Sequence, residues 1–337
     1  MYHKRCFDYI RLEEIFDCKL LTYITGDRQG WETQIAPEVL DHFIHHLDIL
    51  GQPKRIFLYL YTRGGSTIAA WSIVNLIRQF CDELHIIVPS KAHSAGTLMC
   101  LGANSIIMTK QATLGPIDPS INTPLNPPIP GGNPMAKYPV SVEAIKGFFE
   151  LAKSELGIKN DRSLSEVLNK LADMVHPLVL GEVYRARSQI QMLARKLLSH
   201  QQPEKIDEII SFLVSDSGSH DYTIYRREAR EHLGLNVVKP TQEQYVIIKR
   251  IYDNIAEELK LNEPFDQEGL LGTDTQASYS FKRCLIESVE GGSHYFISEG
   301  ELKRIQVHTP TGPQIGIQDH RKFEGWRYEN AANRNSQ

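Results

Sequence analysis

Residues 84–109, LHIIVPSKAHSAGTLMCLGANSIIMT, contain two strand patterns joined by a run of small residues. LHIIVP (84–89) and SIIMT (105–109) are nearly continuous in apolar residues, which is typical of strands that are covered on both faces of a sheet. Between them, AGTLMCLGA (95–103) has the small and apolar residues of a short helix. A strand, a helix and a second strand in this order indicate a right-handed crossover between two parallel strands.

The same alternation extends toward the N-terminus. LLTYIT (20–25) and RIFLYLYT (55–62) have the β-branched and aromatic residues of two further strands. A helix pattern follows each of them, one beginning at Ala36 and the other after Ser66. This repetition of strand and helix predicts an α/β fold with a mainly parallel sheet.

The second half of the chain has a different pattern. Residues 141–215 are helical almost throughout, and we interpret them as a helical insertion in a domain that spans residues 15–240. Residues 241–337 begin with an amphipathic helix and contain two plausible strands, 280–288 and 293–307. We interpret them as a small β-containing extension of that domain.

The composition is that of an ordinary folded protein, with 41% hydrophobic and 23% charged residues. A formal net charge of −4 gives no general attraction to nucleic acid or to an anionic membrane. The five cysteines are scattered and lack C-x-x-C spacing, which fits a reducing compartment. No apolar run approaches the roughly 20 residues of a membrane helix, and the N-terminus lacks a signal-peptide pattern. We therefore expect a cytoplasmic protein that binds no nucleic acid and inserts into no membrane.

No motif for a cofactor or a metal is present in the sequence. The chain has no P-loop, no dinucleotide fingerprint and no zinc signature. His42 and His46 stand one helical turn apart, but no third ligand follows in useful spacing. We expect neither a cofactor nor a metal ion.

Two strand ends carry residues that suit chemistry, since open α/β sheets bind ligands at the carboxyl ends of their strands. Gly64 and Gly65 follow one strand, and glycines let the backbone approach a ligand with bare N–H groups. Ser94 follows the next strand at the start of a helix, where N–H groups stabilise a developing oxyanion. A glycine turn or a helix-capping serine is common by itself. Together they would supply the nucleophile and the oxyanion donors of acyl transfer.

The chain resembles the serine dehydrogenase proteinase family, which belongs to the superfamily of the Clp protease, signal peptide peptidase A and crotonase. The resemblance covers about residues 20–238. It rests on motifs in a fixed order: Gly64-Gly65-Ser66, His93-Ser94-Ala95-Gly96-Thr97, residues 103–108 (ANSIIM), residues 114–119 (LGPIDP) and residues 219–224 (SHDYTI). It implies a ClpP/crotonase-like core of repeated ββα units with Ser94 as nucleophile. It also implies oxyanion donors at the amides of Gly65 and Ala95, with help from Gly64.

The resemblance leaves the general base open. In the Clp protease the histidine lies on the strand after the nucleophile helix, and the equivalent stretch of this chain holds Asp118 instead. His220 falls near the position where the Clp protease has its aspartate. We favour a rearranged triad, in which His220 accepts the Ser94 proton and Asp118 or Asp221 orients the imidazole. A histidine that only bonds to its own loop is the alternative interpretation of His220.

A lysine base is the second possibility, because signal peptide peptidase A uses a Ser–Lys dyad. Lys137 and Lys146 lie at plausible distances downstream of Ser94. A lysine must be desolvated to act as a base, and neither sequence neighbourhood is strongly apolar.

We therefore predict a serine peptidase that hydrolyses peptide bonds through an acyl-enzyme at Ser94. One alternative is a crotonase-like enzyme that acts on acyl thioesters with the same oxyanion hole. Another is a non-catalytic assembly or interaction protein that retains the fold. The family name also refers to serine dehydration, but the sequence has neither a pyridoxal-phosphate lysine nor an iron–sulfur cysteine pattern.

The expected partners are a peptide or protein substrate and further copies of the chain. The superfamily usually forms trimers or larger rings, and the helical stretch 163–213 has more apolar surface than one sheet can cover. Any ATP dependence would come from a separate partner. The proline-rich residues 119–139 form either an ordered loop over the site or a surface excursion.

Overall fold

The computed structural model describes residues 2–117, 120–129, 136–200, 203–216, 221–309 and 312–330. Five parallel strands form one half of its central sheet: β1 (Lys19–Thr25), β2 (Arg55–Tyr61), β3 (Glu83–Val88), β5 (Ser105–Met108) and β10 (Val237–Val238). Three antiparallel strands form the other half: β11 (Gln276–Ser288), β12 (Gly292–Thr309) and β13 (Gly312–Glu329). The order across the sheet is β10-β5-β3-β2-β1-β11-β12-β13. The predicted α/β class with a mainly parallel sheet is confirmed.

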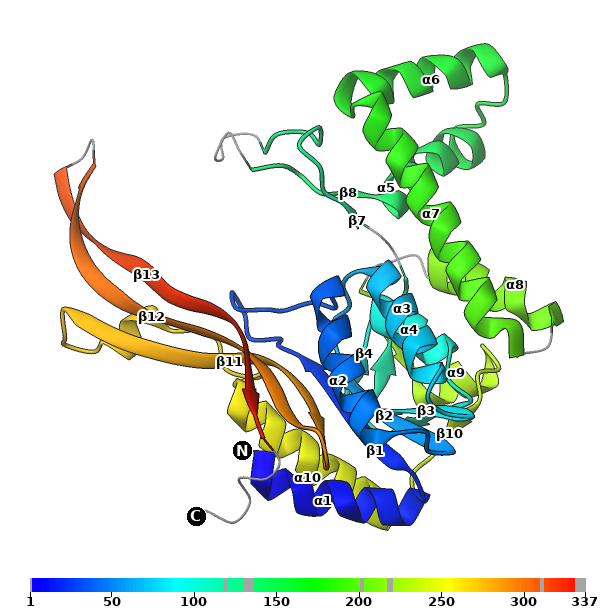
Figure 1. The fold of residues 1–337 in the computed structure, drawn as a ribbon. Coiled ribbons are helices and arrows are strands. Elements are labelled where there is room, and N and C mark those ends of the chain that lie inside the picture. The colour runs from blue at the N-terminus through cyan, green and yellow to red at the C-terminus, as the bar shows by residue number, and fades with distance from the viewer. Residues whose placement is uncertain are drawn as a thin grey trace.

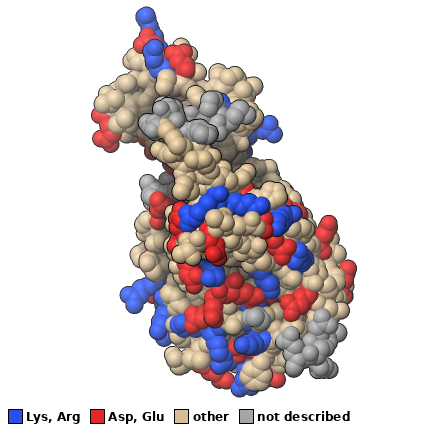
Figure 2. Space-filling model, turned by 90° about the vertical axis from the view of Figure 1, so that its left-hand side faces the viewer, with Lys and Arg blue, Asp and Glu red and all other residues tan. Residues whose placement is uncertain are grey.

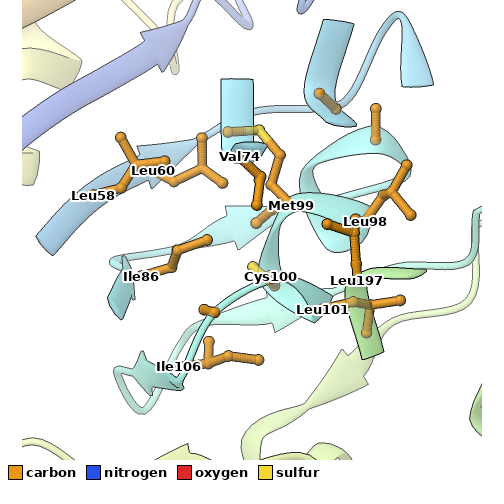
Figure 3. Close-up of a cluster of buried hydrophobic side chains, with 14 of the residues drawn as sticks. Leu58, Leu60, Val74, Ile86, Leu98, Met99, Cys100, Leu101, Ile106 and Leu197 are labelled. Carbon is orange, nitrogen blue, oxygen red and sulfur yellow. The ribbon is translucent and has the colours of Figure 1, made fainter. Parts of the chain in front are cut away.

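Helices cover both faces of the parallel strands, which explains why the strand sequences are apolar throughout. One face carries η1 (Pro37–Val39), α2 (Leu40–Leu50), α3 (Thr67–Arg78) and α4 (Ala95–Leu101). All seven residues of α4 are buried, and its side chains pack between the sheet and Leu197 (Figure 3). The other face carries α1 (Tyr2–Phe16) and α10 (Gln242–Leu259). Among the helices of the described residues, none is both long and apolar enough to span a bilayer.

A small second sheet lies beyond the carboxyl ends of β3 and β5. Its strands are β4 (Lys91–Ala92), β6 (Thr113–Leu114) and β9 (Ile224–Tyr225). β4 and β6 are parallel, and β9 joins β6 in the antiparallel direction. The chain therefore passes through this sheet immediately before Ser94, and the sheet fixes the direction in which α4 begins.

The first part of the predicted helical insertion projects from the body of the molecule (Figure 1), whereas its last part packs on the main core. It contains α5 (Val142–Glu150), the π-helical η2 (Leu151–Glu155), α6 (Asp161–Met174) and α7 (Pro177–Leu197). The hairpin of β7 (Ser120–Ile121) and β8 (Val140–Ser141) precedes it, and η3 (Leu198–His200), α8 (Pro203–Ser211) and the π-helical η4 (Phe212–Asp216) return the chain to the body. Valines at positions 140, 142, 175, 179 and 183 give the projecting part a small core of its own.

The C-terminal extension continues the main sheet. Residues 284–288 of β11 pair with β1, with Leu21 opposite Ser288 and Thr25 opposite Cys284. The two predicted strands correspond to β11 and β12, whereas β13 and the N-terminal α1 were not predicted. The short helices α9 (Arg226–Glu231) and α11 (Gln267–Leu271) complete the fold. A domain boundary at residue 240 stays a prediction.

Candidate active site

Ser94 lies at a sharp turn between β4 and α4. Its backbone has φ 51° and ψ −116°, a conformation that residues other than glycine rarely adopt. The side chain is half-buried and lines a cavity of about 390 Å³. Strain of this kind persists only where the surrounding structure enforces it, and it marks Ser94 as a candidate functional residue.

Buried contacts of the residues that follow Ser94 in the chain enforce this turn. Thr97 Oγ1 lies 2.8 Å from the carbonyl oxygens of both Ala92 and Gly115, and it accepts the Gly115 N–H at 3.0 Å. A Cβ atom on Gly96 would lie 2.4 Å from Thr62 Cγ2. The small and hydroxyl residues after Ser94 are therefore required by the packing of β2, β4 and the loop after β6.

Gly64 and Gly65 approach Ser94 and the chain at Ile35 closely. Their φ angles are 117° and 141°, in the region that favours glycine. A Cβ atom on Gly64 would lie 2.8 Å from Ser94 Cβ, and one on Gly65 would lie 2.4 Å from the Ile35 carbonyl oxygen. Ile35 holds the pair through its N–H, which donates to the Gly64 carbonyl at 2.9 Å, and its carbonyl, which accepts the Ser66 N–H at 2.8 Å.

The backbone amides beside Ser94 differ in their partners. The Gly64 N–H donates to Thr62 Oγ1 at 3.0 Å, and Thr62 Oγ1 is itself bonded to Thr25 Oγ1 at 2.8 Å. Among the hydrogen bonds between described residues, none uses the N–H of Gly65 or of Ala95. Ala95 is the first residue of α4, where an N–H has no partner within the helix.

The cavity around Ser94 is lined mostly by polar residues. They are Glu32, Thr33, Gln34, Arg63, His93, Pro116 and Asp221. The Arg63 guanidinium lies 3.7 Å from a Glu32 carboxylate oxygen and 3.3 Å from one of Asp27. His93 Nε2 lies 2.9 Å from Thr113 Oγ1, and its ring packs on Gly115. Side chains of this kind can form hydrogen bonds with the backbone N–H and C=O groups of a bound polypeptide.

The candidates for the base are placed very differently. Asp221 lines the Ser94 cavity. Asp118 and His220 lie outside the described residues. Lys146, on α5, forms an ion pair with Glu150 at 3.3 Å and lines a different cavity, between α5 and α7.

Lys137 precedes β8. It forms an isolated backbone bridge with Pro128 and is not among the described residues that line the Ser94 cavity. In the described part of the chain, no three histidine, cysteine or acidic side chains converge to hold a metal ion.

Sequence reasoning missed Glu32, Thr33 and Gln34, which reach the cavity from the loop between β1 and η1. The loop follows the carboxyl end of β1, the same edge of the sheet as Gly64 and Ser94. This position in the sequence could have indicated that the loop belongs to the site, because ligands of such sheets bind along this edge.

Residues 41–130, which include Gly64, Gly65 and Ser94, match a family described as ClpP-like SDH-type serine proteinase. The resemblance that the motifs predict is therefore confirmed over these residues, which include the motifs at residues 64–66, 93–97, 103–108 and 114–119.

Two curated relatives come from Methanocaldococcus jannaschii. The uncharacterized protein MJ0137 is 30% identical over 201 residues, which is 59% of this chain and 59% of the relative. The uncharacterized protein MJ1495 is 26% identical over 204 residues, which is 60% of this chain and 59% of the relative. The match thus spans 59% of the length of each relative.

Two solved structures of mutants of the 1510-N membrane-bound stomatin-specific protease are also similar, each at 18% identity. The mutant in complex with a substrate peptide gives a TM-score of 0.37, with 67% of this chain and 78% of that chain covered. The other mutant gives 0.39, with 68% and 85% covered.

Proposed function

We propose that this chain is a serine peptidase that hydrolyses peptide bonds through an acyl-enzyme at Ser94. The observation that carries the proposal is the position of Ser94, which is held in a left-handed conformation against Gly64, beside a polar cavity. The family match over residues 41–130 supports the same activity.

In the proposed reaction, Ser94 Oγ attacks the carbonyl carbon of the scissile bond while a base takes its proton. The N–H groups of Gly65 and Ala95 stabilise the oxyanion of the tetrahedral intermediate. As the intermediate collapses, the base returns its proton to the leaving amine. The base then takes a proton from water, which attacks the acyl-enzyme and releases the acid, and the proton passes to Ser94 Oγ. The N–H of Gly64 is engaged by Thr62, so Gly64 contributes through its close approach to Ser94.

For the base we favour His220, oriented by Asp118 or Asp221. Its support is that two segments reach the Ser94 cavity, one at Asp221, next to His220 in the chain, and the other at Pro116, two residues before Asp118. A histidine also has an ordinary pKa near neutrality. Lys137 is retained as the alternative. Lys146 is disfavoured by its ion pair with Glu150 and its separate cavity.

An active-site fluorophosphonate probe tests the proposal. We expect the wild-type chain to gain the mass of one phosphonyl group, which is the probe less HF, and Ser94→Ala to gain none. Ser188→Ala is the matched control, since Ser188 is an exposed helical serine whose hydroxyl donates to the Tyr184 carbonyl of its own helix. Equal labelling of wild type and Ser94→Ala would refute the assignment. A crotonase-like enzyme or a non-catalytic protein would gain no mass at all.

We further propose that the chain forms a homo-oligomer through the projecting helices. α6 is amphipathic but has no buried residue. Large apolar side chains are exposed there, among them Leu156 (67%), Met174 (75%), Leu178 (63%) and Tyr184 (73%). On the face that Figure 2 draws, charges of both signs are interspersed over the body.

Light scattering at micromolar concentration tests this proposal. We expect an oligomer, and we expect Leu168→Glu on α6 to reduce its size. A strict monomer would contradict the proposal.

The proposed location is the cytoplasm, in keeping with five cysteines that are all free.

A further inference from the structure

The loop between β1 and η1 connects two distant parts of the molecule. At one end Ile35 is bonded to the glycine pair, as described above. In its middle the loop packs on Arg283 of β11, about 250 residues later in the chain. The chain loops out from β1 toward the β11–β13 strands at this point (Figure 1). Of the three cavity residues in this loop, Glu32 and Thr33 contact Arg283 directly, and Gln34 lies between that contact and Ile35.

Arg283 holds the loop through both its side chain and its backbone. Its Nε donates to the Trp31 carbonyl at 2.9 Å, and its terminal nitrogen donates to the Glu32 carbonyl at 2.8 Å. Its own carbonyl accepts the Thr33 hydroxyl at 2.8 Å. A Cβ atom on Gly26 would lie 2.3 Å from that same carbonyl, so the loop begins in direct contact with Arg283.

The Arg283 guanidinium is itself fixed by the two strands that follow. It lies 3.0 Å from Ser298 Oγ on β12 and 2.9 Å from a Glu324 carboxylate oxygen on β13. It stacks over the Trp31 ring at 5.3 Å, and only 15% of its side chain is exposed. A planar guanidinium with several partners is a rigid support, because its donors form a fixed fork.

We propose that Arg283 is a positioning residue for the Ser94 site. Its guanidinium fixes the loop at residues 31 and 32, and the loop in turn fixes the glycine pair through Ile35. The strands β11–β13 thereby set the geometry of a site whose reacting groups come from the parallel half of the sheet. This inference rests on the proposed function of Ser94.

The second-order rate of labelling by the fluorophosphonate probe is the first measurement. We expect Arg283→Gln to react at least tenfold more slowly than wild type, and Arg283→Lys, which keeps the charge, to recover part of that loss. The matched control is Arg327→Gln. Arg327 is an arginine of β13 that pairs with Glu299 on β12. Labelling of Arg283→Gln at the wild-type rate, or equal slowing in Arg327→Gln, would overturn the inference.

Hydrogen exchange is the second measurement, and it does not depend on activity. The N–H groups of Gly26, Thr33 and Ile35 are all hydrogen-bonded in this loop. In Arg283→Gln we expect faster exchange at these three positions and unchanged exchange in α10. Unchanged exchange in the loop would contradict the inference even if the probe reaction were slow.

The two measurements also separate failure of the inference from failure of the proposed function. A wild-type chain that does not react refutes the function, while exchange still decides whether Arg283 holds the loop. If Arg283→Gln does not fold, Arg283→Lys replaces it, because a lysine ammonium lacks the planar fork that reaches the Trp31 and Glu32 carbonyls together. Wild-type labelling and wild-type exchange in Arg283→Lys would then overturn the inference.

Discussion

Ser94 and its immediate neighbours show why particular residue types occupy this turn. The left-handed backbone of Ser94 is compatible with a side chain only because Gly64, opposite it, has none. Gly96 is required by Thr62 in the same way. The sequence pattern of glycines around one serine thus follows from the close packing of two strand ends.

The contact between Gly64 and Ser94 gives a first prediction. Gly64→Ala places a Cβ atom 2.8 Å from Ser94 Cβ at a φ of 117°, so we expect strain of about 1–3 kcal/mol and nearly complete loss of probe labelling. The matched control is Gly51→Ala, at a φ of 72° with no atom within 4 Å of the added carbon. Thermal unfolding and labelling are measured for both. Loss of labelling in Gly51→Ala as well would contradict the prediction, because it would mean that backbone strain away from Ser94 also abolishes labelling.

The Thr97 hydroxyl gives a second prediction. Thr97→Val removes a buried hydroxyl that bonds Gly115, and Thr109→Val removes one that bonds the Pro89 carbonyl at 2.7 Å. Loss of a buried hydrogen bond costs about 1–3 kcal/mol, so both variants should be destabilised in denaturant unfolding. Only Thr97→Val should slow probe labelling. Equal slowing in the two variants would mean that stability, and not the turn, controls reactivity.

At the scale of elements, helix α2 meets strand β12 through histidines. His46 Nε2 lies 3.1 Å from His294 Nδ1, and His46 Nδ1 lies 2.7 Å from Ser288 Oγ. His42 and His45 also pack on the His294 ring. Burial, with repulsion from neighbouring histidines, lowers the pKa of His46 to about 3 and that of His294 to about 4. The contact is therefore built from neutral imidazoles.

This contact predicts a loss of stability in mild acid. An unfolded histidine has a pKa near 6.5, so at pH 5 protons bind the unfolded chain but not these two folded histidines. The stabilisation is complete above pH 6.5 and declines as the pH falls toward the folded pKa values. Urea unfolding should give a free energy about 2 kcal/mol lower at pH 5 than at pH 7 for each histidine. In His294→Phe, the contribution of that histidine to the difference between pH 5 and pH 7 should be absent. In His176→Gln, at an exposed helix start, the difference should be unchanged. Equal unfolding free energies at both pH values would contradict this.

The element scale also shows what the sequence could predict. The parallel strands and their helices were predictable because each is a local apolar pattern. Helix α1 was not, because its buried face includes Arg5 and Asp8. These charged residues are satisfied by Glu287 and Arg250, partners more than 200 residues away.

For the site, Ser94 and the glycines could be named from their motifs, since the glycines whose packing permits the turn, Gly64 and Gly96, belong to those motifs. The loop at Glu32 could not, because its position depends on Arg283, and no local pattern records that contact. β13 was missed for a related reason: most of its residues are exposed, so its pattern contains no buried face.

At the scale of the whole molecule, the C-terminal residues are part of the main sheet and of its core. β11 covers the edge of β1, and α10 packs with α1 on one face of the sheet. The Arg5 guanidinium, 1% exposed, lies between Glu258 on α10 and Glu287 on β11. The two halves of the chain therefore share one buried ionic network.

This arrangement predicts that residues 15–240 do not fold alone. A fragment of residues 15–240 lacks β11, so β1 has no antiparallel neighbour and an unpaired strand edge is exposed. In the full chain, Glu287→Ala removes one carboxylate from Arg5 and should cost about 3–5 kcal/mol. Expression of the fragment and circular dichroism of both proteins check this. A soluble, folded fragment would show that the predicted boundary at residue 240 is also a folding boundary.

Mapping the modified residue tests the central proposal most directly. After reaction with a fluorophosphonate, trypsin should release residues 92–110, AHSAGTLMCLGANSIIMTK, which contain Ser94 and the buried Ser105. Ser105 is an internal control, because its hydroxyl bonds His85 at 2.7 Å away from the cavity. We expect fragment ions to place a single adduct on Ser94. A folded chain that carries the adduct on another residue, or none at all, would contradict the assignment of Ser94 as the nucleophile.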